Sequence, residues 1–313
     1  MRRALRSDDG GAQRALRTRA PIARKPGSDD GVARDRPGLA RGRGDPRRPR
    51  CRSGGPGDRT VTRPRLSVVV VTLNEEERLR ACLESVAWAD EVIVVDALSH
   101  DKTVQIAREF TDRVIVRPWP GFAAQKNFGL AEASGDWILS LDADEQVSAE
   151  LREEILRVLA DDGPYDSYRV PRRNLFGGRW VRHGGLWPDW QLRLFRRGRG
   201  RFVERAVHES VGVTGTVGRC RGALVHRSYR DVADFLTRAD RYSTLAAEEW
   251  VRSGRRVRAT DFVLRPAGRF LSMYILKLGC LDGVRGLLLA CLYAYYVFIR
   301  SVKAWEREGD SRR

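Results

Sequence analysis

Cysteine is scarce in this sequence, and its positions follow no pattern. The five cysteines are odd in number and widely spaced, and no two of them form a CxxC motif. A disulfide-stabilised fold needs a dense, even set of cysteines, and a structural zinc site needs closely spaced pairs. The sequence argues against both and favours a protein of a reducing cytoplasm.

Long apolar runs are also missing. The run at residues 287–299 has 13 residues, whereas a helix that spans a bilayer needs about 20. Basic residues flank it at Arg285, Arg300 and Lys303, and three tyrosines lie within it. This composition is typical of a segment that lies in the membrane interface, so we expect an interfacial element, with a buried core helix as the alternative.

The net charge of +17 is concentrated near the N-terminus, where residues 1–65 carry 19 Arg and Lys against 7 Asp and Glu. This stretch is rich in Arg, Gly and Pro and lacks apolar periodicity, interleaved aromatic residues and the apolar core of a targeting signal. We therefore expect residues 1–63 to be a disordered extension, or an over-extended start of the reading frame. Nucleic acid is not an expected partner.

From residue 66 onward, short apolar runs alternate with helical patterns. Strands are expected at residues 66–72, 91–96, 113–116 and 136–141. Helices are expected near residues 75–86, 101–110, 121–133 and 148–160, and another at 232–251. The alternation predicts an α/β fold with a Rossmann-like, mostly parallel sheet, helices on both faces, and additional C-terminal helices. The first strand-to-helix turn contains no GxGxxG motif, which argues against a nicotinamide-dependent enzyme.

Polar residues follow three of these strands where each one ends. They are Thr72 and Asn74, then Asp96, then the pair Asp142 and Asp144. Ligands of open α/β sheets bind beyond the carboxyl ends of the strands, so these side chains should converge on one site. Two carboxylates in one loop could hold Mg²⁺ or Mn²⁺ against a diphosphate, although acids also commonly precede helices for simpler reasons.

Four segments, at residues 66–74, 92–103, 121–127 and 135–145, together resemble glycosyltransferase family 2, the inverting enzymes of the GT-A fold. The amino-acid sequence at residues 121–127, 187–195 and 207–209 is similar to that of the lipopolysaccharide core β-1,4-glucosyltransferases of the WaaE type. The resemblance implies a metal-dependent hexosyltransferase that uses a UDP-sugar, with glucose expected, and a glycan, glycolipid or lipopolysaccharide core acceptor. A polyprenyl-phosphate glycosyltransferase is the alternative.

The resemblance also assigns roles to the residues at the strand ends. Thr72, Asn74 and Glu75 would line the nucleotide pocket, and Asp96 would contact uracil or ribose. Lys126 would meet donor phosphate or base, with a solvated helix charge as the alternative. Asp142 would contact ribose and metal, and Asp144 would bind the metal. The segment at residues 96–103 departs from the usual sequence motif of the family at Ala97, Leu98, His100 and Lys102.

Inverting transfer needs a base for the proton of the acceptor hydroxyl. We expect Asp189 in this role, because Trp187 and Trp190 beside it could pack a sugar and raise its pKa by desolvation. The alternative is that Asp189 is a structural acid in a loop, paired with a nearby Arg. Glu209 is the second candidate. Further acceptor or phosphate contacts are expected from His183, Gln191 and Arg193.

The patterns and the resemblance together divide the chain into three parts after the N-terminal extension. Residues 64–160 form the expected nucleotide-sugar-binding half, and residues 161–230 the acceptor-binding half. Residues 231–313 form a helical segment that we expect to associate with a membrane. The expected location is the cytoplasm, at the inner face of the cell membrane.

Overall fold

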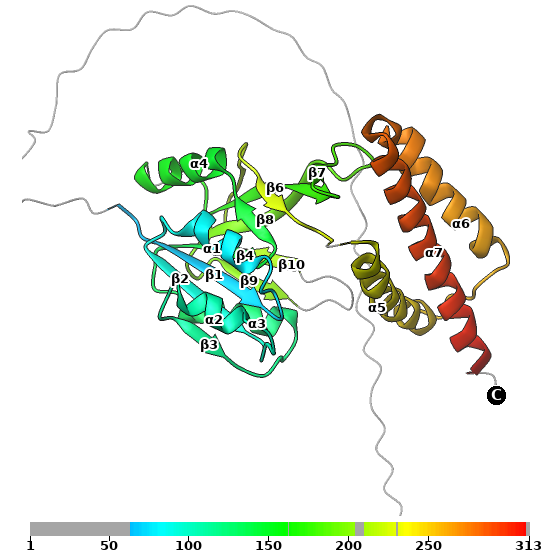
Figure 1. Cartoon of the computed structure of the whole chain (residues 1–313), viewed down its shortest axis with the longest axis horizontal. Coiled ribbons are helices and arrows are strands. Elements are labelled where there is room, and N and C mark those ends of the chain that lie inside the picture. Colours follow the sequence, from blue (N-terminus) through cyan, green and yellow to red (C-terminus); the bar gives the residue numbers. More distant parts are fainter. Residues whose placement is uncertain (1–62, 162, 204–209, 230, 311–313) are drawn as a thin grey trace, which may run out of the picture. The chain divides into compact units, whose positions relative to one another are not determined.

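A computed structural model describes residues 63–161, 163–203, 210–229 and 231–310 (Figure 1). The N-terminal stretch at residues 1–62 and the candidate base Glu209 lie outside these ranges. The predictions made for them therefore stay predictions.

The first half of the sheet is parallel. Its strands are β1 (Leu66–Thr72), β2 (Glu91–Asp96), β3 (Val114–Val116) and β4 (Trp137–Asp142), in the order β3-β2-β1-β4. In this register Thr72 lies opposite Asp96, and Val71 lies opposite Asp142. The carboxyl ends of three neighbouring strands therefore meet at one edge of the sheet, as the sequence predicted.

The sheet continues beyond β4 with strands of both directions, in the order β4-β8-β6-β12-β5. These strands are β5 (Glu145–Val147), β6 (Ser167–Phe176), β8 (Asp189–Arg196) and β12 (Leu224–His226). Strand β8 runs antiparallel to both β4 and β6, and β5 runs antiparallel to β12. The α/β class is thus confirmed with a mixed sheet, in which the parallel arrangement predicted from sequence covers β1 to β4.

Four short strands complete the β structure. Strands β7 (Arg179–Trp180) and β11 (Val217–Arg219) pair with β6. Strands β9 (Gly200–Val203) and β10 (Ser210–Val213) form a separate antiparallel pair.

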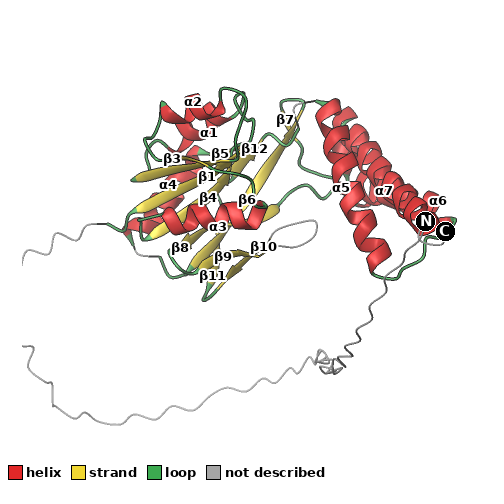
Figure 2. Ribbon diagram, turned by 90° about the horizontal axis from the view of Figure 1, so that it is seen from below, coloured by secondary structure: helices red, strands yellow, loops and turns green. Residues whose placement is uncertain are grey.

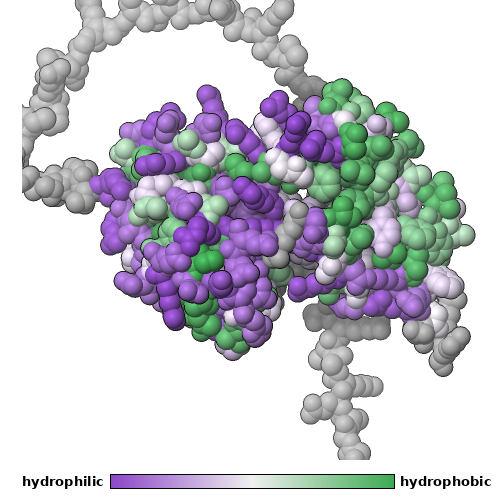
Figure 3. Space-filling model, in the orientation of Figure 1, coloured by the Kyte–Doolittle hydropathy of each residue, from purple (hydrophilic) through white to green (hydrophobic). Residues whose placement is uncertain are grey.

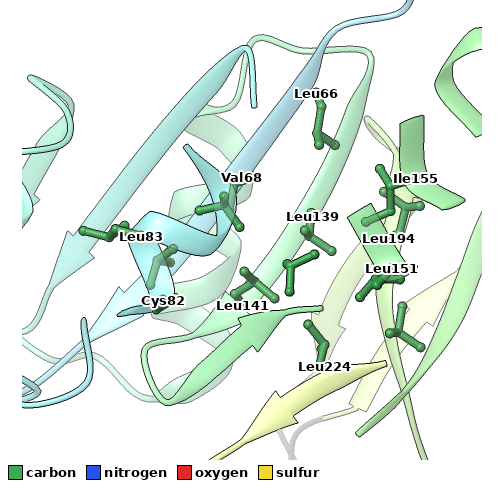
Figure 4. Close-up of a cluster of buried hydrophobic side chains, with 14 of the residues drawn as sticks. Leu66, Val68, Cys82, Leu83, Leu139, Leu141, Leu151, Ile155, Leu194 and Leu224 are labelled. Atoms are coloured by element: carbon green, nitrogen blue, oxygen red, sulfur yellow. The ribbon is translucent and has the colours of Figure 1, made fainter. Parts of the chain in front are cut away.

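Helices cover the sheet because alternate residues of its strands are buried on opposite faces (Figure 2). On one face Val68 and Leu139 pack with α1 (Leu79–Val86) and α4 (Ala149–Ala160), in the cluster drawn in Figure 4. On the other face Val69 lies under α3 (Phe122–Glu132). A Cβ at Gly129 would lie 2.4 Å from Cγ1 of Val69, so glycine permits this close approach. The short helix α2 (Thr103–Arg108) follows β2.

The C-terminal part is helical, as predicted. It contains α5 (Val232–Arg252), α6 (Thr260–Leu271), the short turns η1 (Ser272–Leu276) and η2 (Gly279–Asp282), and α7 (Val284–Asp310). Helix α5 begins at a capped turn in which Asp231 Oδ1 accepts a hydrogen bond from the amide of Asp234 at 2.8 Å. Helix α7 contains the apolar run at residues 287–299, and by length and composition alone its Val284–Gly309 segment could cross a membrane.

Candidate active site

The loops after β1 and β2 are tied together by hydrogen bonds. The carboxylate of Asp96 is buried and accepts hydrogen bonds from Thr72 Oγ1 at 2.9 Å and from the amide of Ser99 at 2.8 Å. Asn74, at a φ of 53°, donates its amide to Ser99 Oγ and accepts from the amide of His100 through Oδ1. These contacts show that Asp96 and Thr72 shape the loop pair. A contact between Asp96 and a nucleotide stays a prediction.

Asp142 lies between two cations. Its Oδ1 is 2.7 Å from Nζ of Lys126, and its Oδ2 is 2.5 Å from Nη2 of Arg193. Burial acts to raise the pKa of Asp142, but Arg193 and Lys126 hold it well below the usual range. Lys126 is only 2% exposed, so its reading as a solvated helix charge is wrong. Its ammonium lies over the ring of Phe202 as well as beside Asp142.

Glu145 binds the guanidinium groups of Arg193 and Arg172 next to this site. The sequence analysis did not predict this role. Its side chain is fully buried, and Oε1 lies 2.6 Å from Arg193 Nη2 and 3.3 Å from Arg172 Nη1. Its Oε2 accepts a hydrogen bond from the amide of Asp142. A chain of alternating charges therefore crosses four strands and a helix. Its members, in order, are Lys126, Asp142, Arg193, Glu145, Arg172 and Asp189.

Asp144 faces a histidine. Its Oδ2 lies 3.4 Å from Nε2 of His226 and 3.5 Å from Nη1 of Arg78. Burial acts to raise the pKa of Asp144, but His226, in its protonated form, and Arg78 lower it overall. The sequence places His226 far from the Asp142 and Asp144 loop, and only the pairing of β12 with β5 and β6 brings it there.

Asn174 fixes which nitrogen of His226 carries a hydrogen. The amide nitrogen of Asn174 donates to the carbonyl of Leu186 at 3.2 Å and approaches Asp189 Oδ2 at 3.4 Å. Its oxygen therefore faces His226 Nδ1, at 2.7 Å, and must accept a hydrogen bond from it. In the neutral imidazole this leaves Nε2 with a lone pair that faces the Asp144 carboxylate. Two acceptors this close need a cation between them, either a proton or a metal ion.

The pair fits the divalent cation that the resemblance to glycosyltransferase family 2 implies. Two ligands that occupy neighbouring positions around a small octahedral cation lie about 3 Å apart, close to the separation of Asp144 and His226. Within the described ranges there is no group of three or more His, Cys, Asp or Glu side chains that could hold a metal. A metal held by Asp144 and His226 would take its other ligands from a diphosphate and water.

Asp189, the expected base, begins β8 and lies opposite Arg172 in the sheet register. Arg172 donates to Asp189 Oδ2 from Nε at 2.9 Å and from Nη2 at 2.6 Å, and Gln191 donates to Oδ1 at 2.7 Å. Burial acts to raise the pKa of Asp189, but the Arg172 ion pair and the hydrogen bonds lower it overall. The expected rise of the pKa is therefore wrong. The structure shows the ion pair with an arginine that was the alternative for Asp189, although Asp189 lies at the start of β8 and its partner comes from β6.

The tryptophans on either side of Asp189 have different surroundings. Trp187 packs edge-on against Trp180, with ring centroids 5.0 Å apart. Trp190 lies under the guanidinium of Arg219 and lines a cavity together with Asp189.

That cavity has a volume of about 450 Å³. Asp189, Asn174 and His226 line its polar side. The rest of the wall is largely aromatic and apolar and comes in part from α5 and α7, through Tyr242, Leu289 and Tyr293. The candidate base and the candidate metal ligand therefore face a single cavity large enough for a sugar.

His183 does not line this cavity. Its amide and its Nδ1 both bind the carboxylate of Asp282, at 2.8 and 3.0 Å. The residue joins the β7–β8 loop to η2, so its expected contact with acceptor or phosphate has no support in the geometry.

The sequence between residues 67 and 224 matches the model of a protein family described as glycosyl transferase family 2. The chain belongs to glycosyl transferase family 2. This confirms the family that the sequence resembled.

Several glycosyltransferases align along most of this chain. It is 33% identical over 255 residues to the lipopolysaccharide core biosynthesis glycosyltransferase LpsC of Rhizobium meliloti, covering 79% of this chain and 94% of that protein. It is 28% identical over 260 residues to an uncharacterized glycosyltransferase of Rickettsia typhi, covering 79% and 89%. Among solved structures, the mannosyltransferase PcManGT of Pyrobaculum calidifontis aligns with a TM-score of 0.45 and 16% identity, over 79% of this chain and 88% of that one.

Proposed function

We propose that this family 2 enzyme transfers a hexose, with glucose from UDP-glucose as the expected donor, to a lipopolysaccharide core or related cell-envelope glycan, with inversion at the anomeric carbon. The observation that carries the proposal is the shared cavity of Asp189 and His226, with Asp144 beside His226 and Asp142 between Lys126 and Arg193. These contacts support a base and a diphosphate site at one end of the sheet. The similarity to LpsC supports the acceptor class.

Asp189 acts as the base in this proposal. An acceptor hydroxyl in the cavity attacks the anomeric carbon, and its proton passes to Asp189 while the bond between that carbon and the diphosphate oxygen breaks. The carboxylate of Asp189, with its lowered pKa, is ionised at neutral pH, as an ordinary aspartate would be, so it can accept a proton. Arg172 fixes the carboxylate's orientation through two hydrogen bonds.

Asp144 and His226 would hold the divalent cation. The cation would neutralise the charge that develops on the departing diphosphate. A ligand pair that includes an imidazole favours Mn²⁺ over Mg²⁺, because Mg²⁺ prefers an all-oxygen shell. Lys126 and Arg193 keep Asp142 ionised and oriented at the same site.

The four cysteines in the described part of the chain are all free, which is compatible with the proposed location in the cytoplasm. The basic and apolar C-terminal helices support a position at the inner face of the membrane.

A screen of UDP-sugars with purified enzyme, a cell-envelope extract as acceptor and Mn²⁺ or Mg²⁺ tests the proposal. We expect metal-dependent release of UDP and labelled product, and loss of both in Asp144→Asn. Full activity of Asp144→Asn in excess chelator would overturn the metal role.

Transfer to a polyprenyl phosphate is the second candidate, and the arginines Arg172 and Arg238 in the cavity wall favour it. A phosphate oxygen is already ionised at neutral pH and needs no base. Full turnover in Asp189→Asn with a polyprenyl phosphate acceptor would therefore select this candidate.

A further inference from the structure

The hairpin formed by α6, η1, η2 and α7 exposes two apolar stripes. Most of the large apolar side chains that are exposed in the described part of the chain lie between residues 263 and 305 (Figure 3). Along α6 and η1 the exposed residues recur every four positions, at Val263, Ala267, Leu271 and Ile275. Along α7 they recur at alternating spacings of four and three, at Val284, Leu288, Cys291, Tyr295 and Phe298. Such spacings place each set on one face of its helix.

The exposure is greatest where the two helices join. Leu276 is 79% exposed, Leu281 65% and Val284 72%. Large apolar side chains that stay in water at a helical turn lack the stabilisation that burial would give them. Contiguous exposure of this kind marks a binding surface.

Charge identifies what this surface binds. The hairpin at residues 260–300 contains five Arg and Lys and only two acids, Asp261 and Asp282, and residues 252–258 just before it add four arginines. Both acids are already paired, Asp261 with Arg265 and Asp282 with His183. A basic and apolar surface is complementary to a lipid leaflet that contains anionic headgroups. Two copies of the chain would instead bring two strongly basic surfaces together.

The far end of α7 is held by the protein itself. Lys303 Nζ lies 2.6 Å from Oδ1 of Asp240 on α5, and Ala304 is buried against Ala247 and Trp250. The remaining apolar part, residues 284–299, is about 24 Å long as a helix, shorter than a bilayer core of about 30 Å. Helix α7 is therefore suited to lie against a leaflet.

The opposite face of α7 contributes to the active-site cavity. Leu289 and Tyr293 line the cavity that contains Asp189, while Leu288 and Cys291 beside them in sequence are exposed. One helix thus carries the cavity wall on one face and the exposed stripe on another.

We infer that the α6–α7 hairpin docks on an anionic lipid leaflet and that the acceptor entering the Asp189 cavity is anchored in that leaflet. The docking stands on the surface of the hairpin alone. The statement about the acceptor rests on the proposed transferase function.

Cys280 and Cys291 provide native reporters of docking. Both are exposed and lie on the hairpin, whereas Cys82 and Cys220 are buried. Residues 1–65 are themselves strongly basic, so vesicle binding of the whole chain would not isolate the hairpin. The rate of alkylation of the two reporters by a membrane-impermeant maleimide, measured in a full-length Cys51→Ser background, does isolate it.

Vesicles of phosphatidylcholine with phosphatidylglycerol should slow alkylation of both reporters by about 10-fold or more, and high salt should reverse much of this protection. Vesicles of phosphatidylcholine alone should protect them less. Equal rates with and without anionic vesicles would overturn the docking. Protection that needs no vesicles and grows with protein concentration would assign the surface to a second copy of the chain and would also overturn it.

Leu276→Asp combined with Val284→Asp tests both parts of the inference, because these exposed positions tolerate a carboxylate without disturbing the core. The double variant should lose the vesicle protection and transfer little label from UDP-glucose to a cell-envelope lipid extract in vesicles. UDP affinity measured by calorimetry with Mn²⁺ should not change. Val217→Asp, an exposed apolar position on β11, is the matched control and should behave like the wild type.

The outcomes separate the two proposals. Absence of UDP binding in the wild type, with vesicle protection intact, would refute the transferase function and with it the anchored acceptor, but leave the docking. Equal labelling of the lipid extract by the double variant and the wild type would overturn the lipid-anchored acceptor.

Discussion

His226 Nε2 lies 3.4 Å from Asp144 Oδ2. Because Asn174 accepts the hydrogen of the other imidazole nitrogen, the neutral ring presents its lone pair to the carboxylate. This arrangement is typical of two metal ligands whose orientation is fixed by an outer hydrogen bond. The proposed metal site therefore includes His226 on β12 as well as Asp144 in the loop after β4.

The first prediction concerns this pair. His226→Ala should weaken Mn²⁺ binding in the presence of UDP by about 10-fold or more, because one ligand is lost. The loss should be smaller for Mg²⁺, which gains less from an imidazole. Calorimetric titration of each metal measures the effect. His183→Gln is the matched control, since His183 binds Asp282 instead of the site. Unchanged Mn²⁺ affinity in His226→Ala would remove His226 from the metal site.

The second prediction uses the ion pair between Arg172 and Asp189. The folded-state pKa of Asp189 is lowered, so its carboxylate stays ionised until the pH falls below the usual range. Arg172→Gln removes the opposite charge and should raise that pKa by about 1 unit or more. Activity requires the ionised base, so the acidic limb of the profile of kcat/KM against pH should move to higher pH in the variant. An acidic limb that stays in place would show that another group titrates there.

The third prediction concerns proton removal. Asp189→Asn keeps the size of the side chain but cannot take the proton, so turnover at saturating donor should fall by about 100-fold or more. UDP affinity should remain near that of the wild type, because in the proposed mechanism Asp189 contacts the acceptor and not the donor. Rapid-quench rates and calorimetry measure the two quantities. Equal losses of rate and UDP affinity would mean that Asp189 supports the fold of the donor site.

The fourth prediction concerns stability. Glu145 is buried between Arg193 and Arg172, and Glu145→Gln leaves two guanidinium groups without their shared carboxylate. Removing one partner of such a buried network lowers the free energy of unfolding by about 3 to 5 kcal/mol. Urea denaturation measures this loss, with Glu150→Gln on the exposed first turn of α4 as the control. A loss as small as the control's would show that Glu145 contributes little to the network.

The sequence predicted the alternation of strands and helices from residue 66 to 160 because each element there is specified by its own periodicity. It also predicted that Thr72, Asp96 and Asp142 would meet, since parallel neighbouring strands end at one edge. The helix at residues 232–251 followed from its apolar face in the same way. These features depend on residues close together in the chain.

Only the tertiary structure decided the electrostatics of the site. Arg172, Glu145, Arg193 and His226 come from four different strands, and no local pattern indicates that they share one network. The burial of Lys126 and the direction of the Asp189 pKa depend on those partners. The structure therefore contradicts only the alternative of a solvated charge for Lys126, whereas for Asp189 the expected rise of the pKa was wrong. A pKa and an ion pair are set by which groups lie within a few ångströms in space, and antiparallel pairing of β8 with β4 and β6 determines that here.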